Sequence, residues 1–203
     1  MKNKLLKILS IGILSFSLLQ TNANAITESE SNKIIKSFML QAPQIVKDNL
    51  IGVSIKIQND KEFNEEGYEY GIYKNDGTAG YRGVLKRKDN SSIIRINIDT
   101  DKAREGYMID TFFHECFHEI DSYFSRSARC WKVKYSDKQN FINLYNEYKN
   151  NDNIGTYYLS SSREFFAQCG MIYVLYPQFL QKEYPKVYNY MDNLIKNYKT
   201  KNI

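Results

Sequence analysis

The sequence contains few cysteines, and this shortage excludes a small fold held together by disulfide bonds. Three cysteines in 203 residues are too few for a disulfide framework, so a hydrophobic core must hold the fold. Because three is odd, at least one thiol is free or pairs with another chain. A bridge between Cys130 and Cys169 is one open pairing. The basic residues form no stripe and match no nucleic-acid motif, so we expect no nucleic-acid partner.

Long apolar runs are absent beyond the N-terminus. Residues 8–19 form one apolar run, which follows three lysines and precedes Ala23-Asn24-Ala25. This pattern is typical of a signal peptide, and the run is shorter than the roughly 20 apolar residues of a membrane span. We therefore expect residues 1–25 to be removed and residues 26–203 to be extracellular, with no stable membrane association. Removal of these residues would lower the formal charge of the chain from +5 to about +2. The alternative is that residues 1–25 remain as an uncleaved membrane anchor.

The rest of the pattern predicts one α+β domain without repeats or linkers. Thr27 and Glu30 have the spacing of a capping box, and Pro43 is expected to split the helix that they begin. Alternation over residues 51–58 predicts a half-buried strand with Gln58 at a polar position. Two further strands are expected over 81–87 and 93–98, and helices over 105–124, 137–149, 164–176 and 177–197.

Only two histidines occur in the sequence, and both lie in His114-Glu115-Cys116-Phe117-His118. For two histidines placed at random, a His-Glu-x-x-His match has a probability of roughly one in a thousand. Helix positions i and i+4 are about 40° apart on one face, so both imidazoles can bind one Zn²⁺. Glu115 lies beside them as the candidate general base. The alternative is a core helix whose histidines only pack or form hydrogen bonds.

A catalytic zinc also needs a third protein ligand. The metzincin pattern requires a histidine six residues after the second one, but Phe124 occupies that position. A downstream carboxylate is therefore required. Glu164 is the best candidate, since it lies 46 residues after His118 at the start of a predicted apolar helix. A capping box with Ser161 explains Glu164 equally well, so the local pattern leaves both roles open.

Three more residues of the motif helix have specific predictions. Asp121, one turn beyond His118, could accept a hydrogen bond from an imidazole N–H and orient the ring; the alternative is a solvated acid at the helix end. Glu119 points away from the metal face and is expected to be a surface charge. Cys116 lies opposite the histidines and is expected to be a buried thiol.

The paired motifs resemble the anthrax lethal factor catalytic-domain family of secreted zinc metallopeptidases, which includes the clostridial Pro-Pro endopeptidases. The signature is His-Glu-x-x-His-x-x-Asp followed by Glu-Phe-Phe-Ala, which begins at Glu164 here, and the resemblance covers roughly residues 80–200. It implies a zincin-like fold, mostly helical, with a small mixed sheet and an active-site helix carrying the first motif. It also implies Zn²⁺ bound by His114, His118 and Glu164.

In the family, a tyrosine seven residues before this glutamate stabilises the transition state. That spacing falls on Tyr157, although the adjacent Tyr158 leaves the assignment open by one residue. Two departures concern local packing and substrate fit. Phe117 stands where the family often has a small residue, and Gln168 stands where Glu-Phe-Phe-Ala is usually followed by Glu.

The function implied by the resemblance is hydrolysis of peptide bonds by a zinc-activated water, with Glu115 as the general base. We expect a monomer that acts on a protein or peptide substrate outside the cell. That substrate is either a bacterial surface protein, cut at Pro-Pro bonds, or a host protein. The alternative from another class is a non-catalytic, zinc-stabilised, secreted binding protein.

Overall fold

The structure, a computed structural model, describes residues 27–59, 61–63, 65, 83–88, 91–98, 105–127, 134–150 and 154–198. The expected signal peptide and Cys130 lie outside these residues. The first described elements are α2 (Glu28–Gln41), α3 (Gln44–Asn49), β1 (Val53–Gln58), β2 (Gly83–Lys88) and β3 (Ser91–Asn97). They are followed by α5 (Glu105–Ser127), α6 (Gln139–Tyr148), the 3-10 helix η2 (Thr156–Leu159), α7 (Ser162–Leu175), α8 (Pro177–Glu183) and α9 (Pro185–Lys196).

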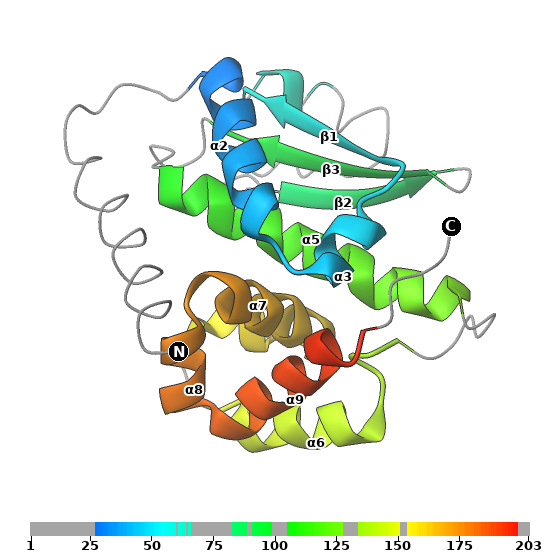
Figure 1. The fold of residues 1–203 in the computed structure, drawn as a ribbon, viewed down its shortest axis with the longest axis vertical. Helices are drawn as coiled ribbons and strands as arrows, with labels where there is room; N and C mark the ends of the chain where they lie inside the picture. The colour runs from blue at the N-terminus through cyan, green and yellow to red at the C-terminus, as the bar shows by residue number, and fades with distance from the viewer. Residues whose placement is uncertain are drawn as a thin grey trace.

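The long helix α5 lies between the sheet and the C-terminal helices (Figure 1). The sheet, α2 and α3 lie on one side of α5, and helices α6 to α9 lie on the other. Because α5 is covered from both sides, Phe112 and Phe113 in its middle stretch are fully buried in one continuous core. The predicted α+β class, mostly helical with a small sheet, is confirmed.

The sheet has three described strands in the order β1-β3-β2. β1 runs parallel to β3, whereas β2 runs antiparallel to it, so the sheet is mixed as predicted. Ile94 in the central strand pairs with Ile55 on one side and with Leu85 on the other. Of the described strands, β2 forms the edge opposite β1.

Arg95 in β3 is a fully buried charge, with none of its surface exposed. Its Nε donates to Gln58 Oε1 at 2.8 Å, and its guanidinium also donates to the Phe63 carbonyl and lies over the Phe63 ring. A buried guanidinium needs such partners, because an unpaired buried charge is strongly unfavourable. The polar position predicted for Gln58 is therefore corrected: the side chain is buried, since it accepts from Arg95.

The predicted start and break of the first helix are confirmed. The Thr27 backbone N–H donates to the Glu30 carboxylate at 3.0 Å, and the Glu30 N–H donates to Thr27 Oγ1 at 3.2 Å. Together these bonds form the capping box. α2 ends at Gln41 and α3 begins at Gln44, with Pro43 between them.

The prediction of a single last helix over 177–197 is wrong. Tyr184 has φ −134° and ψ 57°, which separates α8 from α9. The cause is Pro185, because proline lacks a backbone N–H and disfavours the helical conformation of the preceding residue. Among the described residues, no helix combines the length and hydropathy of a membrane span.

Candidate metal centre

The candidate site forms where α5 and α7 pack against each other. Gly170 of α7 faces Phe117 of α5, and a Cβ atom on Gly170 would lie 2.1 Å from Phe117 Cδ1. Any larger residue would therefore have to displace the Phe117 ring or one of the two helices. Phe117, the bulky residue before the second histidine, is accommodated because a glycine stands opposite it on the facing helix.

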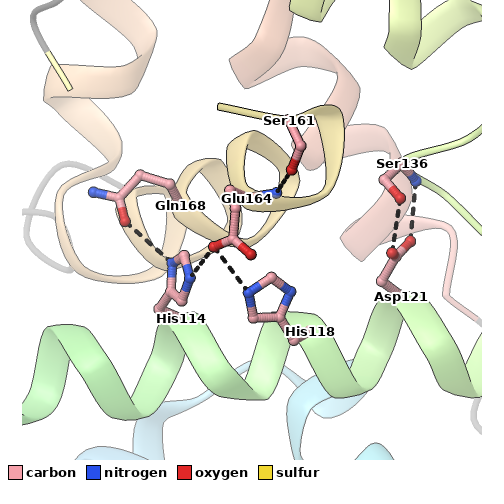
Figure 2. A network of polar contacts seen from close by, with 7 residues as sticks. All are labelled: His114, His118, Asp121, Ser136, Ser161, Glu164 and Gln168. Carbon is pink, nitrogen blue, oxygen red and sulfur yellow. Dashed lines mark hydrogen bonds and ion pairs between the residues drawn. The ribbon is translucent and has the colours of Figure 1, made fainter. Parts of the chain in front are cut away.

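Three side chains from these helices converge on one point (Figure 2). His114 Nε2 lies 3.1 Å from Glu164 Oε2, and His118 Nε2 lies 3.2 Å from the same oxygen. One nitrogen or oxygen from each residue lies within 4.8 Å of the others. These three residues are the predicted ligands, and the group could hold a metal ion.

Two of the three spacings between these atoms are close to those around a tetrahedral metal ion. Bonds of roughly 2.0–2.2 Å to zinc place neighbouring ligand atoms roughly 3.3–3.6 Å apart in a tetrahedron. The two nitrogen–oxygen distances, 3.1 and 3.2 Å, are slightly shorter than this. Each of these two contacts would lengthen by a few tenths of an ångström to reach zinc-binding spacing.

Burial and hydrogen bonding give two of these groups the charge states that a metal needs. Burial lowers the pKa of His118 to about 4, and its hydrogen bond with Glu164 opposes this only in part. Burial raises the pKa of Glu164, but the hydrogen bonds with His114 and His118 outweigh it and hold that pKa well below its usual range. At neutral pH His118 is then neutral and Glu164 ionised, as metal ligation requires.

Of the capping box that the local sequence of Glu164 left open, only the Ser161 half is formed. The Glu164 backbone N–H donates to Ser161 Oγ at 3.2 Å, so Ser161 caps the start of α7. The Glu164 carboxylate turns the other way, toward the two histidines (Figure 2). Capping uses the backbone of Glu164 and leaves its side chain available to a metal.

Gln168 is a site residue whose role the sequence analysis missed. It lies one turn after Glu164 on α7, is 7% exposed, and places its Oε1 3.3 Å from His114 Nδ1. When Nδ1 carries the proton, it donates to Gln168, and Nε2 keeps its lone pair for a metal. The available signal was the four-residue spacing between Glu164 and Gln168, which puts both side chains on one helix face.

The two predicted catalytic side chains lie in the same region. Glu115 neighbours His114 on α5 and is 6% exposed. Tyr158 of η2 packs against the His114 ring, with ring centroids 5.3 Å apart. Tyr157 packs edge-on against Tyr158 and is 56% exposed. The roles of Glu115 and Tyr157 stay predictions, and both tyrosines belong to the segment beside His114.

Asp121 is fully buried, so the alternative of a solvated acid is wrong. Its two carboxylate oxygens accept from the Ser136 backbone N–H at 3.0 Å and from Ser136 Oγ at 2.8 Å. Burial still raises the pKa of Asp121 above its usual value. These bonds fix the segment before α6 against α5. The proposed role of Asp121 in orienting an imidazole stays a prediction.

Two predictions about the remaining residues of α5 have opposite outcomes. Glu119 is 2% exposed, so the prediction of a surface charge is wrong. The reason is the position of α5 between two layers, which leaves this stretch of the helix no solvent face. Cys116 is a buried free thiol, as predicted, and Cys169 is free and buried as well.

A search of solved structures finds a Pro-Pro endopeptidase from Paenibacillus alvei, with a TM-score of 0.58 and 22% sequence identity. The match covers 85% of this chain and 95% of that chain. The chain has the fold of this endopeptidase. The zincin-like fold expected from the paired motifs is thereby confirmed. No protein-family model and no curated protein matches the sequence.

Proposed function

We propose that this protein is a secreted, zinc-dependent endopeptidase. The observation that carries the proposal is the convergence of His114, His118 and Glu164 from two helices. Two imidazoles and one carboxylate form the donor set of several catalytic zinc sites, and three protein ligands leave a fourth position open. The fold, similar to that of a Pro-Pro endopeptidase, supports the same reaction class.

The chain supplies the groups that hydrolysis of a peptide bond needs. When bound, zinc acts as a Lewis acid that brings the pKa of a water ligand toward about 7. Glu115 accepts the proton from the attacking water and passes it to the leaving amine. Tyr157 donates a hydrogen bond to the oxygen that gains negative charge, and Gln168 holds the His114 ring in orientation.

The edge strand β2 is the proposed place for the substrate backbone. β2 is paired to β3 on one side in the described sheet, and the sheet packs against α5. An extended peptide can add to such an edge through backbone hydrogen bonds. A proline in β2 should therefore weaken peptide binding, whereas unchanged binding would count against this placement.

We propose an extracellular protein as the substrate and a monomer as the active form. The Pro-Pro endopeptidase that shares the fold suggests Pro-Pro bonds in a bacterial surface protein, and a host protein is the other candidate. Cleavage profiling on a peptide library, with and without a chelator, separates these specificities and tests the dependence on metal.

A Glu115→Gln variant tests catalysis apart from metal binding. It keeps the size of the side chain but removes the base, so zinc content should survive while cleavage falls by a factor of roughly 100 or more. Glu147→Gln is a matched control, because Glu147 is exposed and pairs with Lys186 away from the site. Wild-type protein that binds zinc but cleaves no library peptide would instead support a zinc-stabilised binding protein.

A further inference from the structure

A pocket of about 330 Å³ lies next to the metal group. Two of its lining residues tie it to that group. Gln168 lines the pocket and also contacts His114 Nδ1. Asp110 lines it too, and stands four residues before His114 on α5. The pocket therefore lies about one helical turn from the ligands, roughly 5.4 Å along the helix. An extended peptide covers that distance in about two residues.

The walls of the pocket are mainly apolar. Ile154, Met171 and Ile172 are nearly buried and line its interior. Tyr176 and Phe179 also line it, and these aromatic side chains are 37% and 40% exposed. Two aromatic side chains that line the same pocket and remain this exposed are available to be covered by an apolar group of a ligand.

The size and charge of the pocket favour one kind of occupant. A cavity of roughly 150 Å³ can hold a benzene ring, so a volume of about 330 Å³ admits one large side chain but no folded segment. The charged group in the lining is the Asp110 carboxylate, which accepts a hydrogen bond from the Tyr176 hydroxyl at 2.9 Å. An acidic side chain would be repelled there.

We infer that this pocket binds a large apolar side chain of the substrate, within two residues of the cleaved bond. The inference rests on the proposed peptidase function, and it assigns that site a preference for leucine, methionine or phenylalanine at one substrate position. Gln168 then joins the two parts of the site, since it contacts a metal ligand on one side and lines the pocket on the other.

The test uses zinc-loaded protein and quenched peptides that vary one position at a time among Ala, Leu, Phe, Asp and Lys. Wild type should prefer Leu or Phe over Ala at one position by roughly tenfold or more in kcat/KM. Phe179→Ala should remove most of that preference, whereas Phe179→Leu should keep it. Leu40→Ala is the matched control, because Leu40 is 79% exposed on α2, and it should leave the profile unchanged.

Three results would overturn the inference. They are the absence of any position with an apolar preference, a preference that Phe179→Ala leaves intact, and a preference for Lys that Asp110→Asn abolishes. If wild type cleaves no peptide, the same peptides are titrated calorimetrically into Glu115→Gln. Binding that favours Leu over Asp and is lost in Phe179→Ala would support the pocket while the proposed function fails. Equal binding of all peptides would overturn it.

Discussion

Gly170 and Phe117 fit against each other so closely that the glycine leaves no room for a methyl group. A Cβ atom there would lie 2.1 Å from one ring carbon and 2.2 Å from the next. This contact sets the approach of α7 to α5, and Glu164 stands six residues before Gly170 on α7. The geometry of the metal group therefore depends on a contact that involves none of its ligands.

Replacing Gly170 by Ala should destabilise the protein and weaken metal binding. The extra methyl must displace the Phe117 ring or α7, at a cost of about 1–3 kcal/mol in the free energy of unfolding. The measurements are chemical denaturation and zinc affinity by chelator competition.

A double-mutant cycle is the control for this contact. Phe117→Ala removes Cγ and the whole ring, the atoms closest to the added methyl, so the Gly170→Ala substitution should cost less in that background. A cost that is identical in both backgrounds would show that the two residues are not coupled.

Gln168 should act on the metal through His114. Gln168→Leu removes the acceptor at His114 Nδ1, and loss of such a hydrogen bond lowers metal affinity by roughly 10–100-fold. Gln168→Glu keeps an acceptor and should retain affinity. Zinc competition with a chromogenic chelator measures both. Equal affinities in wild type and Gln168→Leu would contradict the role assigned to Gln168.

The sequence predicted the helical part of the site well, because its signals are local. The four-residue spacing of His114 and His118 defines one helix face, and Ser161 caps the start of α7, one of the two possibilities that the local pattern left open. Glu164 needed the family resemblance, since its local pattern fits a cap equally well. The structure shows the Glu164 backbone N–H donating to Ser161 and the Glu164 carboxylate turned to the histidines, so the side chain takes no part in a capping box.

The errors have a common physical cause, which is that burial depends on partners distant in sequence. Glu119 was expected in solvent, but α5 is enclosed by two layers. Gln58 was placed on a polar face, but Arg95, 37 residues away, binds it inside the molecule. The Ser136 partner of Asp121 lies 15 residues further along the chain. Such contacts cannot be predicted from the periodicity of a single helix or strand.

The two tyrosines of η2 can be separated by kinetics. Tyr157→Phe should lower kcat by a factor of roughly 100 to 1,000 if that hydroxyl stabilises the oxyanion, with zinc content unchanged. Tyr158→Phe keeps the ring that packs on His114 and should have a small effect. The opposite pattern in kcat would assign the role to Tyr158.

Cys116 and Cys169 should resist alkylation in the folded protein. Burial raises the pKa of both thiols well above the usual value, and the thiolate is the reactive form. Peptide mapping after iodoacetamide treatment at pH 8 should find both unmodified, and both modified after addition of denaturant. Modification of either residue at the same rate in folded and unfolded protein would contradict its burial.

The zinc content of Glu164→Ala tests the central claim most directly. Wild type and the Glu147→Ala control should each bind one zinc ion per chain. The zinc content is measured by plasma mass spectrometry after dialysis against a buffer that contains trace zinc. Glu164→Ala should bind far less, because it removes the carboxylate on which both histidines converge. One zinc ion per chain in a folded Glu164→Ala protein would contradict the proposed metal centre.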